Sequence, residues 1–237
     1  MNLSAPIHQL KRKARLMSRA ERIPLHAALD RIAIEEGYRS WSLLSAKQPG
    51  MTSIRALWPL LVPGDLVLIA GRPGQGKTLA GLALLAEAMR VGHRGVFLTL
   101  EYALADVFSR LQAINIEPGE FAGLFDCDCS DAISADYIVA RLAEAPRGTV
   151  AVIDYLQLLD QRRDTPELAL QVRALKAFAR ERGLILVFLS QVDRSYEGAG
   201  KPFPEIADVR LPNPLDLSLF DKTCFVNRGE TRFRAAA

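Results

Sequence analysis

The residues with the clearest chemical potential form one glycine-rich stretch, "GRPGQGKT" at 71–78. Its spacing, G-x-x-x-x-G-K-[ST], lets glycine backbone N–H groups turn inward around phosphates, while a lysine and a hydroxyl complete the site. We expect Lys77 to reach the β- and γ-phosphates and the Thr78 hydroxyl to bind Mg²⁺. The stretch therefore predicts a nucleoside triphosphate site. Its predicted phosphate-binding residues are Gly71, Arg72, Pro73, Gly74, Gln75, Gly76, Lys77 and Thr78.

Three polar residues each end or directly follow an apolar run elsewhere in the chain. Asp154 ends "TVAVID", Glu101 follows "GVFLTL", and Gln191 follows "LILVFLS". An Asp at such a strand end can hold Mg²⁺, a Glu can orient or deprotonate water, and an amide can bond the γ-phosphate. From the residues alone, a helix-starting Glu and a turn-forming Gln remain open alternatives. We expect all three side chains at the sheet edge that carries the phosphate loop.

The elements that must position these residues alternate along the chain. Apolar runs at 66–70, 95–100, 149–154 and 184–190 are typical of strands buried on both faces. Helical patterns separate and follow them. These patterns lie at 77–91, 103–114, 132–144 and 166–182. Such alternation predicts an α/β fold with a central, mostly parallel sheet flanked by helices.

The first fifty residues differ from the rest in charge. They hold nine Lys and Arg against four Asp and Glu, whereas the remainder holds 21 against 23. Their apolar spacing predicts two or three short helices over 5–47, followed by a turn-rich linker. We therefore expect a small basic helical segment at 1–48 and an ATPase domain at 49–237.

The densest basic cluster in that segment allows two interpretations. Lys11, Arg12, Lys13 and Arg15 could attach nucleic acid or a protein partner. They could equally be the solvated face of a small amphipathic helical bundle.

Other classes of protein are disfavoured by composition. No apolar run approaches the roughly 20 residues of a membrane span, and the N-terminus has no signal-peptide core, so we expect a cytoplasmic protein without membrane contact. Cys127, Cys129 and Cys224 are too few for a disulfide framework or a four-ligand zinc site. We expect all three to be plain reduced thiols.

Together the motifs resemble the motor domain of the DnaB-type replicative helicases. The resemblance rests on "PGDLVLIAGRPGQGKT", "FLTLE", "VIDYLQLL" and "LSQVDRS", and it extends over roughly 53–228. It implies a RecA-like P-loop ATPase that uses ATP and Mg²⁺. It also implies Glu101 as catalytic base, Asp154 as the metal-associated carboxylate and Gln191 as the phosphate sensor. The KaiC- and RadA-like ATPases share this fold and remain an alternative.

The resemblance further implies a homo-oligomer, in the family a hexameric ring, whose channel loops hold single-stranded DNA. The corresponding stretches are 160–168 and 193–214, although a solvated charged loop is nearly as good an interpretation. The candidate DNA contacts are Arg162, Arg163, Arg194 and Lys201. An arginine finger reaching the neighbour's nucleotide would be Arg228, Arg232 or Arg234.

The chain also departs from the family's pattern. We expect no counterpart here of the N-terminal half of a replicative helicase, with its primase-interacting domain. The leading expectation is an ATP-hydrolysing helicase or motor acting on single-stranded DNA. The alternative is a nucleotide-dependent switch or accessory module that assembles with a partner without processive unwinding. A small-molecule kinase is disfavoured because "DYLQLL" and "LSQ" are not typical of such enzymes.

Overall fold

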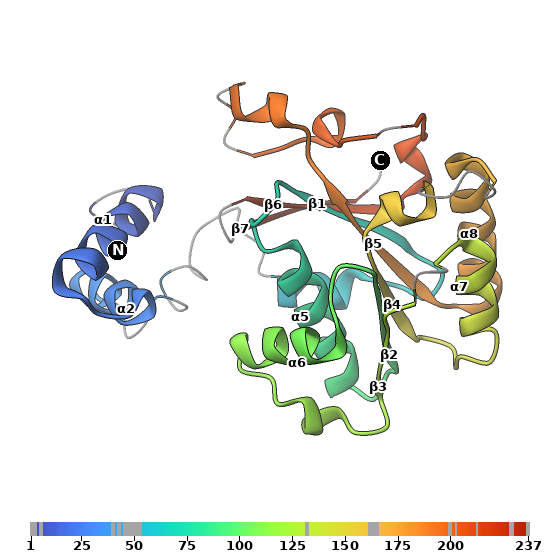
Figure 1. Cartoon of the computed structure of the whole chain (residues 1–237), viewed down its shortest axis with the longest axis horizontal. Coiled ribbons are helices and arrows are strands. Elements are labelled where there is room, and N and C mark those ends of the chain that lie inside the picture. Colours follow the sequence, from blue (N-terminus) through green and yellow to red (C-terminus); the bar gives the residue numbers. More distant parts are fainter. Residues whose placement is uncertain are drawn as a thin grey trace. The chain divides into compact units, whose positions relative to one another are not determined.

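The computed structural model folds as two compact units, Met1–Met51 and Thr52–Ala237, which are described separately below (Figure 1). No helix among the described residues has the length and apolar character to cross a membrane. The residues that the structure describes are 4, 7–38, 41, 44, 54–130, 133–160, 166–198, 201, 203–211, 213–227 and 230–235.

The first unit is built on two helices, α1 (Ile7–Glu21) and α2 (Leu25–Glu35). They pack through a small apolar core formed by Leu10, Ala14, Ala28, Ile32, Ala33 and Leu44. The chain then leaves α2 through Gly37, whose φ of +83° is a conformation that glycine adopts without strain.

The second unit is built on one seven-stranded sheet of order β3-β2-β4-β5-β1-β6-β7. The strands are β1 (Leu66–Gly71), β2 (Gly95–Thr99), β3 (Phe125–Asp128), β4 (Val150–Asp154), β5 (Ile185–Gln191), β6 (Lys222–Asn227) and β7 (Glu230–Ala235). All neighbouring pairs are parallel except β6 and β7. The four strands predicted from apolar runs are the four contiguous central ones, which confirms a mostly parallel sheet.

Helices cover both faces of this sheet. α5 (Lys77–Arg90) and α6 (Leu104–Ala113) lie on one face, and α7 (Ala135–Leu142) and α8 (Leu168–Arg182) lie on the other (Figure 1). Side chains along β1 alternate between the two resulting cores: Val67 and Ile69 pack toward α5, and Leu66 and Leu68 toward α8. Both faces are therefore apolar, as the near-continuous apolar strands predicted.

Shorter elements complete the unit. They are α4 (Ile54–Leu57) and the 3₁₀ turns Trp58–Leu60, Pro118–Phe121, Leu156–Asp160, Arg194–Gly198, Ile206–Asp208 and Leu217–Leu219.

All four predicted helices are shorter in the structure than the sequence pattern predicted, and α7 and α8 show the local reason. α7 begins after Ser134, whose hydroxyl accepts a hydrogen bond from the Tyr137 N–H at 3.2 Å and so caps the helix. α8 begins two residues after Pro166 and ends at Arg182, where Gly183 follows with a φ of +65°.

Candidate active site

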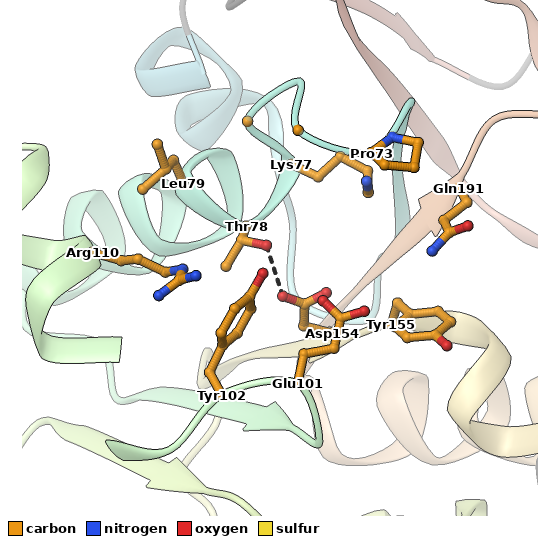
Figure 2. A pocket seen from close by; sticks show the side chains of 12 residues that line it. Pro73, Lys77, Thr78, Leu79, Glu101, Tyr102, Arg110, Asp154, Tyr155 and Gln191 are labelled. Atoms are coloured by element: carbon orange, nitrogen blue, oxygen red, sulfur yellow. Dashed lines mark hydrogen bonds between the residues drawn. The ribbon is translucent and has the colours of Figure 1, made fainter. Parts of the chain in front are cut away.

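A cavity of about 330 Å³ opens at the carboxyl ends of the central strands. It brings together residues from the phosphate loop, α5, α6 and the ends of β4 and β5, which are far apart in the sequence (Figure 2). Its lining consists of Pro73, Gly74, Gly76, Lys77, Thr78, Leu79, Glu101, Tyr102, Arg110, Asp154, Tyr155 and Gln191.

The phosphate loop owes its shape to two glycines. Gly74 has a φ of +72° and Gly76 a φ of +96°, which other residues adopt only with strain. Gly76 leads directly into α5, so the first N–H groups of that helix lie at the cavity. The loop therefore supplies backbone donors together with the positive end of a helix dipole, the combination that binds phosphate.

Lys77 and Thr78 are the first two residues of α5 and face the cavity differently. The Lys77 ammonium lies 3.4 Å from the Arg72 carbonyl oxygen. Burial lowers the pKa of Lys77, although Asp154 and Glu101 oppose that shift. The Thr78 hydroxyl donates a hydrogen bond to Asp154 Oδ2 at 2.9 Å. This contact joins the phosphate loop to β4 across the width of β5, which lies between β1 and β4.

Asp154, the last residue of β4, is only 2% exposed. Burial raises the pKa of Asp154 to about 6; Thr78 and Lys77 oppose the rise, and nearby Glu101 adds to it. Because burial destabilises the ionised form of Asp154, a cation that binds beside this carboxylate stabilises it.

Glu101 and Gln191 line the same cavity as Asp154 (Figure 2). Glu101 follows β2, its side chain is exposed, and its N–H donates to Thr99 Oγ1 at 3.1 Å. Gln191 is the last residue of β5 and is half-buried. The cavity therefore holds an accessible carboxylate, a buried carboxylate and an amide around one space.

The charges of this cavity are not neutralised by ion pairs. Within the part of the chain that the structure describes, Lys77, Glu101 and Asp154 form no salt bridge, although they face the same space. The described residues also contain no group of three His, Cys, Asp or Glu side chains able to hold a metal ion. The Thr78 and Asp154 oxygens are nevertheless the hard ligands that Mg²⁺ prefers, and Mg²⁺ ordinarily completes its shell with water and phosphate oxygens. The donor set therefore fits a magnesium–nucleotide complex.

Several lining residues were missed by the sequence prediction. The Arg110 guanidinium on α6 lies 3.6 Å from the centroid of the Tyr102 ring and donates to the Asp106 carbonyl at 3.1 Å. Tyr102 follows Glu101 directly, so this stacking holds the chain next to Glu101 against α6. Leu79 and Tyr155 were also missed. Their adjacency to Thr78 and Asp154 was the available signal, whereas nothing in the sequence indicated which face of α6 turns inward.

Three residues of the predicted phosphate loop lie outside the lining. These are Gly71, Arg72 and Gln75. The Arg72 guanidinium points instead toward the segment after β5. Its Nε lies 2.8 Å from Glu197 Oε1, and its Nη1 donates to the Val192 carbonyl at 3.1 Å. Arg72 therefore links the phosphate loop to the segment after β5.

The candidate DNA contacts have different environments. Arg162 and Arg163 lie outside the described residues. Arg194 is exposed at the start of a 3₁₀ turn. Lys201 lies 3.2 Å from Asp208 and 3.7 Å from Glu205, so it would have to leave these carboxylates to meet a phosphate.

Two of the three arginine-finger candidates lie on β7. The Arg232 guanidinium is 5.3 Å from the Phe203 ring centroid, and Arg234 is 3.5 Å from Glu205. Neither lines the cavity of its own chain. Arg228 lies outside the described residues.

The cysteines lie away from the cavity lining. The sulfurs of Cys127 and Cys129 on and beside the edge strand β3 are 3.9 Å apart. Burial, reinforced by Cys129 and by Asp126 and Asp128, raises the pKa of Cys127 to about 12. Burial likewise raises the pKa of Cys224 to about 12. Both thiols are therefore protonated at neutral pH, which disfavours metal binding by these residues.

Comparison with known families gives one match to a family model. The model of the DnaB-like helicase C-terminal domain matches residues 127–230. Among curated proteins, the replicative DNA helicase DnaB of Haemophilus influenzae is 25% identical over an alignment that covers 87% of this chain and 51% of that protein. A probable plasmid replicative DNA helicase of Chlamydia trachomatis is 26% identical, over 80% of this chain and 49% of that protein. The chain thus spans about half the length of these relatives.

Solved structures show the same fold. One solved ATPase domain superposes with a TM-score of 0.59 at 20% identity, covering 78% of this chain and 79% of that one. A structure of a DnaB-like replicative helicase and its interactions with primase superposes with a TM-score of 0.59 at 17% identity, covering 92% of this chain and 64% of that one. The predicted RecA-like α/β fold is confirmed by these likenesses.

Proposed function

Because the chain contains a DnaB-type C-terminal domain, we propose that it hydrolyses ATP with Mg²⁺ and uses the energy to move on single-stranded DNA. The observation that carries this proposal is the cavity in which a phosphate loop faces two carboxylates and an amide from separate strand ends. No ion pair among the described residues joins Lys77, Glu101 or Asp154, so these groups remain available to a charged ligand.

Each group has a distinct proposed role. The backbone N–H groups of residues 74–78 and the Lys77 ammonium bind the triphosphate and orient it toward Glu101. Glu101, the exposed carboxylate of the cavity, accepts the proton of the attacking water. Gln191 donates its amide hydrogen to the γ-phosphate or to that water. The backbone of Gln191 is also tied to the segment after β5, because the Arg210 backbone N–H donates to the Gln191 backbone carbonyl at 2.7 Å.

The magnesium site consists of the Thr78 hydroxyl and the Asp154 carboxylate. Their 2.9 Å contact sets the two oxygens side by side, so that both face one point next to the phosphate loop. When bound, Mg²⁺ neutralises the phosphate oxygens. The two residues contribute by fixing its position, and the buried position of Asp154 strengthens its attraction for a cation.

Movement on DNA requires further partners. We propose a homo-oligomeric ring in which an arginine on β7 approaches the nucleotide of the neighbouring subunit. The exposed Arg194 is the described candidate for phosphate contact after β5, since Lys201 is held by two carboxylates.

The direct test is ATP hydrolysis by the purified chain with and without single-stranded DNA. We expect DNA to stimulate hydrolysis. Glu101→Gln should lower kcat by about 10²- to 10⁴-fold while ATP binding persists, because it removes only the base. Lys77→Ala should weaken ATP binding as well, because it removes a phosphate contact made before reaction.

Glu181→Gln is the matched control for charge. Glu181 is an exposed carboxylate on α8, outside the cavity lining, and its substitution should leave the rate unchanged. A slow rate that ignores DNA and is equal in the wild type and Glu101→Gln would refute the motor proposal. It would favour a nucleotide-dependent switch instead.

A further inference from the structure

Three arginines form one face of α1. Arg12, Arg15 and Arg19 are spaced by three and four residues, so they lie along one side of the helix, and all three are exposed. Leu10 and Ala14 are 3% and 0% exposed and define the opposite side, which packs into the core of the first unit. The arginines therefore point away from the core, and packing does not account for them.

The carboxylates of this unit do not account for the arginines either. Residues 1–51 contain four side-chain carboxylates, and each has another partner in the structure. Glu21 pairs with Arg31 and Glu35 with Lys13. Asp30 accepts from the Trp41 N–H at 2.9 Å, and Glu36 accepts from the Ser4 N–H at 2.8 Å.

The described part of the unit thus leaves an arginine face without an anion. Arg12, Arg15 and Arg19 form no salt bridge with a described residue, whereas Lys13 on α1 and Arg31 on α2 do. Three aligned positive charges repel one another at low ionic strength, and an external polyanion relieves that repulsion. Guanidinium groups match phosphate oxygens in geometry, since each presents paired N–H donors.

The kind of polyanion can be inferred because the arginine face, in the described part of the unit, offers neither free aromatic rings nor a broad apolar surface. The aromatic rings of Tyr38 and Trp41 pack against the unit's own core, so they are not available to stack on unpaired bases. Leu16, 58% exposed beside the arginines, is a single apolar side chain and offers far less surface than a protein interface buries. Seven residues of helix span about 10 Å, and duplex DNA carries a phosphate charge about every 1.7 Å along its axis.

We propose that the outward arginine face of α1, made by Arg12, Arg15 and Arg19, binds the phosphate backbone of duplex DNA without regard to base sequence. The second unit would act on the single strand, and the first would hold the adjoining duplex. The inference rests on the proposed function only for the choice of DNA as the polyanion.

The test measures the affinity of the full chain for a blunt 30-base-pair duplex, without nucleotide, across a range of salt concentrations. We compare the wild type with Arg15→Gln/Arg19→Gln. Each lost phosphate contact should reduce the slope of log K against log salt by about 0.9, so the double variant should lose about two units of slope.

Lys13→Gln/Arg31→Gln is the matched control, because it also removes two positive charges from the first unit. Those charges already pair with Glu35 and Glu21, so the slope should stay at the wild-type value. Circular dichroism of both variants checks that they keep their helices. A wild-type slope in Arg15→Gln/Arg19→Gln, or an equal loss in the control, would overturn the proposal and leave an acidic protein or solvent as what meets this face.

A second measurement separates this inference from the proposed function. ATP hydrolysis stimulated by a single-stranded oligonucleotide should be the same in the wild type and in Arg15→Gln/Arg19→Gln, because that activity belongs to the second unit. If duplex affinity falls while stimulation persists, the two units have separate DNA contacts. If stimulation falls as much as duplex affinity, the arginines serve the motor itself, and the assignment of duplex binding to the first unit is wrong.

Discussion

Charged side chains lie near both ends of strand β1. They form ion pairs near its first residue, whereas the charged residues that line the cavity beyond its last residue form none in the described part of the chain. At its start, every charge has a partner. The Lys222 ammonium pairs with Asp65, which is only 5% exposed and also accepts from the Val62 N–H at 2.7 Å. Asp221 accepts from the Leu66 N–H at 2.9 Å and lies 3.1 Å from both Lys176 and Arg180.

At the other end of β1, the charges face one another without pairing. The Lys77 ammonium donates to the Arg72 carbonyl at 3.4 Å, and Asp154 accepts a hydrogen bond from the uncharged Thr78 hydroxyl. The pKa directions follow this difference. Burial raises the pKa of Asp154 to about 6. Burial would also raise the pKa of Asp221, but the Leu66 N–H, Lys176 and Arg180 outweigh it and lower that pKa.

The comparison contrasts a structural charge cluster, here called the structural end (Asp65, Asp221 and Lys222), with one proposed to be functional, here called the functional end (Lys77, Glu101 and Asp154). Both ends combine Asp with Lys within the same strand neighbourhood, so composition does not separate them. The structural end satisfies its charges with its own hydrogen bonds and ion pairs and gains stability. The functional end leaves its charges unsatisfied, which lowers stability until a ligand binds.

The largest expected effect is at the functional end, with Asp154→Asn. The substitution keeps the shape and an acceptor for Thr78 but removes the negative charge, so we expect at least about a 100-fold loss of ATP hydrolysis. In magnesium-free buffer at pH 8, the same variant should be more stable than the wild type, by up to about 3 kcal/mol, because the buried charge is gone. Urea unfolding measures the second effect.

The sign of the pH dependence is fixed by the direction of the shift. An Asp has a pKa near 4 when unfolded and about 6 here, so ionised Asp154 penalises folding increasingly between these values and fully above pH 6. The stability advantage of Asp154→Asn should therefore be absent below about pH 4 and complete above about pH 6. A variant less stable than the wild type at pH 8 would contradict the idea that this end stores unsatisfied charge.

The next largest effect is expected at Gly71. This residue ends β1, where the strand lies very close to the backbone of β6. A Cβ on Gly71 would lie 2.6 Å from the Val226 carbonyl oxygen, which belongs to the backbone. We expect Gly71→Ala to lower the free energy of unfolding by about 1–3 kcal/mol through this overlap. Chemical denaturation provides the measurement.

Gly119→Ala is the control for that substitution. A Cβ at Gly119 meets no atom within 4 Å, and its backbone is not in the left-handed region, so its stability should match or slightly exceed the wild type. Equal midpoints for the two variants would mean that β6 shifts without cost at this end.

Sequence reasoning succeeded where chemistry and burial coincide. Strands β2, β4, β5 and β1 are buried on both faces, so the sequence showed them as apolar runs. A polar residue at or after the end of β2, β4 and β5, and the phosphate loop after β1, marked the edge of the sheet. The convergence of Lys77, Glu101 and Asp154 follows from that geometry. Their catalytic and metal-binding roles remain predictions until they are measured.

The edge strands β3 and β7 and the Tyr102–Arg110 contact could not be predicted from the sequence, for physical reasons. The edge strand β3, "FDCD", alternates apolar side chains with Asp126 and Asp128, which meet Arg141 on the other face, and it is only four residues long. β7, "ETRFRA", is largely polar because it pairs on one side only. The Tyr102–Arg110 stack depends on how α6 is rotated, which tertiary packing decides.

The smallest expected effect is at the structural end, with Asp221→Asn. The variant loses the attraction of Lys176 and Arg180, and because these groups are partly exposed we expect a loss of only about 1 kcal/mol at pH 7, with ATP hydrolysis unchanged. The lowered pKa of Asp221 means that its contribution is present above the unfolded value near 4 and disappears as the pH falls through the folded value. The difference from the wild type should therefore shrink below about pH 4, opposite in sign to that of Asp154→Asn. Glu181→Gln, on the same helix as Arg180, should show neither effect. If Asp221→Asn lost activity but not stability, the two ends of β1 would not differ in the way proposed.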